Sequence, residues 1–129
     1  MREATRSRLE VAHELSVHLA QCADVCAVLA VGSVALDRCT QDSDLDLIVI
    51  WKDQSDFRTA IIRSEAVRGI RVDYECMSVS EAFAITGNQK SDVKVLRDAA
   101  RIGLGVPIYD PNGLAPALRR SSETLSPPR

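Results

Sequence analysis

An unbroken run of apolar residues, Val25–Val31, limits the fold of this sequence more than any other feature. A strand with one face in water alternates apolar and polar side chains, whereas a continuous apolar run of this length is typical of a strand buried on both faces. The run ends at Gly32 and Ser33, a pair that favours a tight turn. We therefore expect a central strand of a β-sheet, followed directly by a turn.

Two other segments, residues 44–51 and 70–77, alternate with a period of two and are predicted to be strands. In the first, the alternation places Asp44 and Asp46 on one face, opposite the leucine side chains. In the second, Asp73 lies on the face opposite the apolar residues. If these two strands are neighbours in the sheet, all three aspartates project from the same face.

Apolar residues at helical spacing, together with capping and turn signals, predict several helices. The expected helices cover residues 3–21, 34–39, 55–67, 78–85, 91–100 and 114–120. The third is expected to end near Gly69 as a C-terminal cap, and the fourth to begin with a capping box from Ser78 to Glu81. A short edge strand is expected at residues 106–109. Together these elements predict an α/β fold with a small mixed β-sheet, helices packed on one face and the aspartates on the exposed face.

The chain has 129 residues, which is the size of one domain. We expect the domain to cover residues 1–120, and the Ser- and Pro-rich residues 121–129 to form a disordered tail. The net charge of -2 provides no basic footprint, so strong nucleic-acid binding is not expected. No apolar run is long enough for a membrane anchor or placed as in a signal peptide. The four cysteines lack the spacing of metal ligands, so we expect them to be free thiols in a cytoplasmic protein.

The turn and the three aspartates are the residues to which we assign chemistry. Gly32 permits a sharp turn close to a ligand, and Ser33 with the first amides of the following helix offers donors to phosphate oxygens. Asp44 and Asp46 are two residues apart on one strand, so both carboxylates can reach one hard cation. Asp73 would complete a site for one or two metal ions, and Mg²⁺ suits such oxygen ligands.

Two charged residues, Arg71 and Glu75, flank Asp73 on its face of the strand. They could orient a nucleotide or pair with one another across the sheet surface. We expect them to pair with one another, as an ordinary exposed ion pair.

The Gly-Ser pair at 32–33 and the Asp-Leu-Asp run at 44–46 resemble the signature of the DNA polymerase beta nucleotidyltransferase superfamily. The Val-Asp-Tyr run at 72–74 resembles the third acidic strand of that superfamily. Within it, the short length and the ending at 106–110 are most similar to the minimal nucleotidyltransferases, including those that act as antitoxins to HEPN-domain ribonucleases. The resemblance covers residues 20–113 and implies a polymerase-beta-like nucleotidyltransferase fold.

The resemblance also implies a role for each of these residues. Asp44 and Asp46 would hold the metals, and Asp73 would bind the catalytic metal and help to activate the acceptor hydroxyl. Gly32 and Ser33 would bind the nucleotide phosphates. The implied cofactor is Mg²⁺ and the implied nucleotide is ATP, whose AMP would pass to a hydroxyl on a partner protein, such as a tyrosine of a HEPN-type toxin.

Two alternatives remain open at this point. In the first, the acceptor is a small molecule such as an aminoglycoside antibiotic, and a homodimer builds its pocket from two copies. In the second, the chain keeps the fold but works by binding and blocking a partner without catalysis. Small members of the family often carry a basic residue and an Arg-Gly pair after Gly-Ser, whereas residues 34–37 here are Val, Ala, Leu and Asp.

Overall fold

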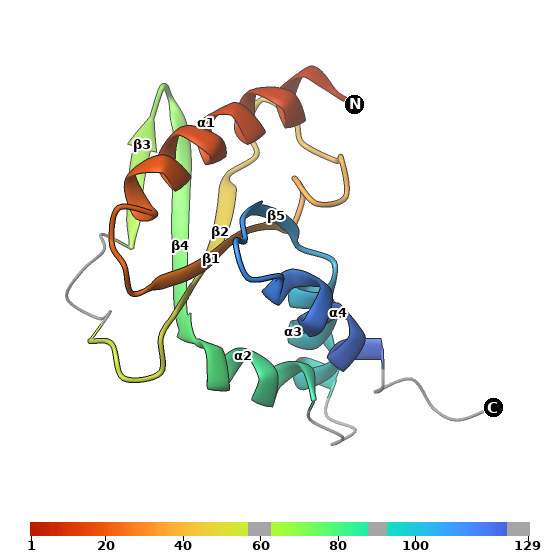
Figure 1. Cartoon of the computed structure of the whole chain (residues 1–129). Helices are drawn as coiled ribbons and strands as arrows, with labels where there is room; N and C mark the ends of the chain where they lie inside the picture. The colour runs from red at the N-terminus through yellow and green to blue at the C-terminus, as the bar shows by residue number, and fades with distance from the viewer. Residues whose placement is uncertain (57–62, 88–92, 124–129) are drawn as a thin grey trace.

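The computed structural model describes residues 1–56, 63–87 and 93–123. The elements in these ranges follow one another as α1 (Glu3–Leu19), β1 (Val25–Val31), β2 (Leu45–Trp51), β3 (Ser64–Val67), β4 (Ile70–Ser78), α2 (Val79–Thr86), α3 (Val93–Gly103), β5 (Val106–Tyr109) and α4 (Leu114–Glu123) (Figure 1). The strands form one sheet in the order β3-β4-β2-β1-β5. Since β2 and β4 are parallel and the other neighbours antiparallel, the predicted α/β fold with a mixed sheet is confirmed.

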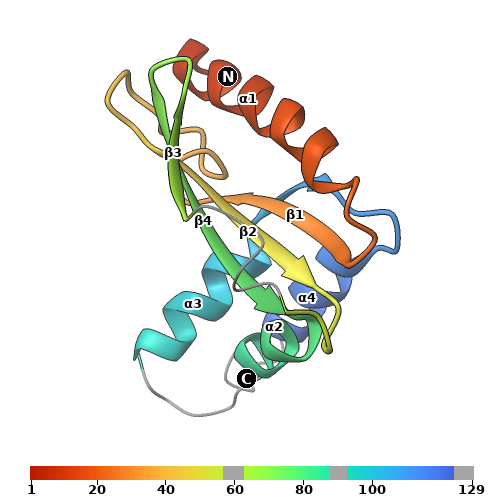
Figure 2. The same cartoon turned by 90° about the vertical axis from the view of Figure 1, so that its left-hand side faces the viewer.

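Helices cover both faces of the sheet. Leu47 and Val49 of β2 pack with Val11 of α1, whereas Ile48 and Ile50 belong to a second core that includes side chains of α2, α3 and α4. Figure 2 shows α1 and α3 on opposite sides of the strands. The expectation of helices on one face is therefore wrong. Because β1 and β2 are apolar on both sides, each face has to be shielded from water.

The segment at Ser64–Val67 is a strand, not the end of the expected helix 55–67. It pairs antiparallel with β4, and Arg68 and Gly69 form the hairpin turn between Val67 and Ile70. Both turn residues have positive φ, 50° and 77°, as a two-residue hairpin requires. Gly69 thus serves a turn instead of a helix cap, and pairing with β4 outweighs the helical spacing of the local apolar residues. Residues 57–62 of that expected helix lie outside the described residues.

The segment after β1 is a series of turns, so the expected helix at 34–39 is also wrong. Its backbone hydrogen bonds follow no single spacing: Leu36 N donates to Gly32 O, Asp37 N to Val34 O, and Arg38 N to Ser33 O. Asp37 has a φ of 51°, which a helix does not tolerate.

The C-terminal half agrees closely with the sequence. The Ser78 and Glu81 capping box is present, and it opens α2. Asp110 accepts hydrogen bonds from the Leu114 and Ala115 amides at 2.7 and 2.8 Å, which begins α4 directly after the predicted turn. That helix continues to Glu123, so residues 121–123 are helical instead of disordered. The predicted cap at residue 91 and the remaining tail, 124–129, fall outside the described residues.

Two further observations concern the whole described chain. All four cysteines are free thiols, as their spacing suggested. Among the described residues, no helix combines the length and the apolar character needed to cross a bilayer.

Candidate functional site

Asp46 lies at the meeting point of three segments that are distant in the sequence. The parallel pairing of β2 with β4 sets Asp46 directly beside Asp73. The antiparallel pairing of β2 with β1 sets Asp46 opposite Val31, the residue that precedes Gly32. The strand order thus confirms that the strand of Asp73 neighbours the strand of Asp46. Both residues lie on the α2–α4 face, because Asp46 is two positions before Ile48.

The turn at Gly32 closes against the Asp46 carboxylate. Gly32 has a φ of 70°, and a Cβ atom on it would lie 3.1 Å from Asp46 Oδ2. Glycine is therefore required twice, once for the left-handed backbone and once for the close approach. The turn after β1 therefore lies against Asp46, the aspartate that pairs laterally with Asp73.

Ser33 follows in the same turn and is half-buried. The Cys39 thiol donates to Ser33 Oγ at 3.6 Å, a weak bond that fixes the hydroxyl near the base of the turn. The peptide N–H groups from Ser33 to Ala35 donate none of the hydrogen bonds found in the described part of the chain. No helix begins in the turn directly after Ser33, so a phosphate bound here would accept hydrogen bonds from free peptide N–H groups of the turn.

Negative charge is concentrated around Asp46, which is half-buried. Burial raises the pKa of the Asp46 carboxyl, and the Arg101 guanidinium opposes this effect. The neighbouring carboxylates of Asp73, Asp44 and Glu75 raise the same pKa further. Asp46 is therefore held in a position that disfavours its charged form, and a bound cation would relieve that repulsion.

The aspartates match a hard cation in the type of donor they offer. Asp44 immediately precedes β2, and Asp46 and Asp73 are lateral neighbours in the sheet. Carboxylate oxygens are the ligands that Mg²⁺ prefers. Within the ranges that the structure describes, however, no three His, Cys, Asp or Glu side chains converge as a ready metal site. Asp73 in particular is engaged by Arg71, whose Nε lies 3.1 Å from its Oδ1.

The charged neighbours of Asp73 pair differently from the sequence prediction. Arg71 bonds Asp73, and Glu75 bonds Arg101 of α3, with 2.5 Å between Arg101 Nη1 and Glu75 Oε2. The predicted Arg71 to Glu75 pair is therefore wrong. Arg101 is a site residue that sequence reasoning missed, because nothing in its local sequence indicates that α3 brings it to Glu75 of β4.

A cavity of about 560 Å³ lies elsewhere, between α3 and α4. Its lining includes Leu96, Gly103, Leu104 and Arg119, and none of the aspartates. This cavity holds no cluster of groups suited to phosphoryl chemistry. We therefore place the candidate site at Asp46.

No protein-family model and no curated protein matches the sequence. Among solved structures, the fold is similar to that of a nucleotidyltransferase-like protein from Exiguobacterium sibiricum 255-15, with a TM-score of 0.55 and 16% sequence identity. The likeness covers 91% of this chain and 38% of that protein, so this chain spans well under half of its structural neighbour. The chain thus has a nucleotidyltransferase-like fold, in agreement with the resemblance seen in the sequence.

Proposed function

We propose that this chain is a metal-dependent nucleotidyltransferase that moves a nucleoside monophosphate, AMP from ATP, to an acceptor hydroxyl. One observation carries the proposal: Asp46 lies beside Asp73 and against the Gly32 turn, within a nucleotidyltransferase-like fold. A turn with free amides that lies against one of two neighbouring carboxylates suits a nucleotide bound together with a divalent cation.

In this proposal Asp44, Asp46 and Asp73 hold Mg²⁺. The chemistry that bound Mg²⁺ supplies is neutralisation of the charge on the triphosphate and on the leaving pyrophosphate. The repulsion among the carboxylates around Asp46 supports this assignment, because a cation would offset it. Binding would also require Asp73 to exchange its contact with Arg71 for one with the cation.

The remaining roles fall to groups on the same side of the sheet. The free amides of the turn after Gly32 bind phosphate oxygens, and the Arg101 guanidinium adds positive charge near Asp46. The acceptor hydroxyl oxygen forms a bond to the α-phosphorus, the bond from that phosphorus to the bridging oxygen breaks, and pyrophosphate leaves. Asp73 accepts the hydroxyl proton.

We further propose that the acceptor is a hydroxyl of a partner protein, such as a tyrosine of a HEPN-type toxin, and that the enzyme acts in the cytoplasm. This extends the sequence resemblance to the minimal nucleotidyltransferases, a group that includes antitoxins to HEPN-domain ribonucleases. The two alternatives, a homodimeric enzyme that modifies an antibiotic and a binding protein without catalysis, lead to different outcomes in the same experiment.

The test is incubation of the purified chain with Mg²⁺ and ATP labelled at the α-phosphate in a lysate of the native host, beside Asp46→Asn. The other three nucleoside triphosphates are tested in parallel, because the sequence does not indicate which base is bound. A labelled protein that is absent with Asp46→Asn supports the proposal and identifies the partner. A labelled small molecule favours the antibiotic-type reaction, and no transfer from any nucleotide favours the binding protein.

A further inference from the structure

Arg8 of α1 is buried, with 6% of its surface exposed, and it binds the segment that leads into the site. Its Nη2 donates to the carbonyl oxygens of Gln41 and Ser43 at 2.9 and 3.1 Å, and its Nε donates to the Ser43 oxygen at 3.2 Å. Its Nη1 donates to Ala4 O and Ser7 Oγ within its own helix. The Ser43 carbonyl belongs to the peptide bond whose nitrogen is that of Asp44.

All the partners of Arg8 are carbonyl or hydroxyl oxygens. It forms no ion pair within the described ranges. A buried cation without a carboxylate costs free energy, so this arrangement needs several hydrogen bonds to persist. The rigid fork of a guanidinium can donate to two peptide carbonyls at once, which a lysine ammonium on its flexible stem does less well.

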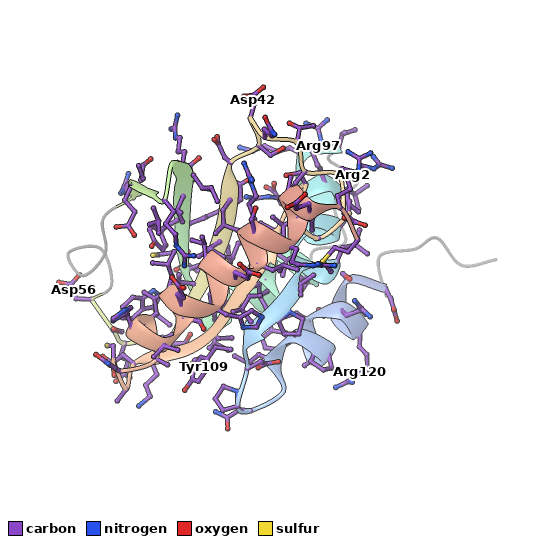
Figure 3. All side chains as sticks on the ribbon, turned by 90° about the horizontal axis from the view of Figure 1, so that it is seen from above. Arg2, Asp42, Asp56, Arg97, Tyr109 and Arg120 are labelled. Carbon is purple, nitrogen blue, oxygen red and sulfur yellow. The ribbon has the colours of Figure 1, made fainter. Side chains whose placement is uncertain are left out.

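A second contact from the same helix holds the same loop nearer to β1. The Arg2 amide donates to Asp37 Oδ1 at 3.0 Å, which fixes the turn after Gly32 to the residue that precedes α1. Within the loop, Thr40 N donates to Ser43 Oγ at 2.8 Å. In Figure 3, Asp42 at the tip of the loop points away from α1. The loop is therefore held at two places, by Arg2 at Asp37 and by Arg8 at Gln41 and Ser43, and the Ser43 carbonyl lies one peptide bond from Asp44.

We propose that Arg8 is a positioning residue, which holds the Gln41 and Ser43 carbonyls so that Asp44 stays beside Asp46. It acts from the opposite face of the sheet, because α1 packs on the core that lies away from the aspartates. The catalytic consequence rests on the proposed nucleotidyltransferase function. The ordering of the loop does not, so the two can be tested separately.

The experiment compares the full chain with Arg8→Met, Arg8→Lys and Arg6→Met. Arg6 is an exposed arginine on the same helix and serves as the matched control. Amide hydrogen exchange is followed in residues 40–46 and in β1, with the melting temperature of each variant. The Mg²⁺ concentration for half-maximal nucleotidyl transfer and the kcat at saturating nucleotide are measured on the same samples.

With Arg8→Met we expect exchange in residues 40–46 to become about tenfold faster while β1 stays protected. We expect kcat to fall and half-saturation to need more Mg²⁺, whereas Arg8→Lys recovers part of both and Arg6→Met matches the original chain. If Arg8→Met does not fold, Arg8→Lys is judged by the same local comparison.

Unchanged exchange in residues 40–46 would overturn the proposal. So would an increase that is equal in β1, since Arg8 would then only stabilise the whole fold. If the original chain transfers no nucleotide, the proposed function fails, and hydrogen exchange alone decides whether Arg8 holds the loop.

Discussion

Gly32 and Asp46 are in contact: the position of a Cβ on Gly32 lies 3.1 Å from Asp46 Oδ2. The two residues are on different strands, and the antiparallel pairing of β1 with β2 brings them together. The other two glycines with positive φ, Gly69 and Gly113, have open space at the Cβ position. The close contact therefore links the backbone of the turn to the proposed metal ligand.

Replacement of Gly32 by alanine tests this link, with Gly113→Ala as the control. The two glycines have φ values of 70° and 71°, but Gly113 has nothing within 4 Å of the Cβ position. Both variants should lose about 1–2 kcal/mol of stability from backbone strain. Only Gly32→Ala should also move Asp46, and we expect its kcat/KM for nucleotidyl transfer to fall about 100-fold. Equal activity in the two variants would contradict the role of the contact.

In the absence of Mg²⁺, Asp46→Asn should stabilise the fold at pH 7. In its presence, the same variant should lose nucleotidyl transfer. Burial first, and then the neighbouring carboxylates, raise the pKa of Asp46 in the folded chain. When folding raises the pKa of an acid, the folded state binds the proton more tightly than the unfolded state does. The resulting stability is fully present below the pKa of the unfolded state and is lost as the pH rises through the pKa of the folded state. The melting temperature of the variant should therefore exceed that of the original chain at pH 7, and the difference should disappear near pH 3. A lower melting temperature at pH 7 would show that the carboxylate is stabilising.

Addition of Mg²⁺ should make the original chain more stable than Asp46→Asn. At a concentration 100 times its Kd, a ligand that binds only the folded state adds about 2.7 kcal/mol of stability. We expect a gain of this size in the original chain, its loss on addition of EDTA, and little gain in Asp46→Asn. Calorimetric melts with and without Mg²⁺ provide the measurement. An equal gain in both proteins would place the metal elsewhere.

Arg101→Met should reduce transfer more than stability. Its ion pair with Glu75 is partly exposed, so its loss should cost less than about 1 kcal/mol of folding free energy. Loss of its positive charge near Asp46 should lower kcat/KM about tenfold, chiefly through weaker nucleotide binding. Arg97→Met, an exposed arginine on the same helix, is the control and should leave both quantities unchanged. If both variants lose activity equally, a general effect of charge on α3 is the better explanation.

Local pattern predicted most of the strands and helices correctly. The apolar run at β1 and the alternation in β2 and β4 reflect burial on one or both faces of a strand, which side-chain hydropathy records directly. The capping box at Ser78 and Glu81 is likewise a local signal, because all its hydrogen bonds lie within four residues. The two errors, at 34–39 and at Ser64–Val67, occurred where contacts from elsewhere override local spacing. In the first segment, the Asp37 side chain accepts a hydrogen bond from the Arg2 amide, just before α1. The second segment pairs with β4.

The sequence by itself determined the side chains to which we first assigned chemistry, because the Gly-Ser turn and the three aspartates follow from chain-local spacing. Only the tertiary structure decided what surrounds them. Arg8 and Arg101 reach the loop and Glu75 across 35 and 26 positions of sequence, distances at which periodicity carries no information. The same holds for the contact of Gly32 with Asp46, which exists because strand pairing sets the register. Residue types and periods are properties of the chain, whereas pairings between distant segments arise only when the sheet closes and both of its faces are covered.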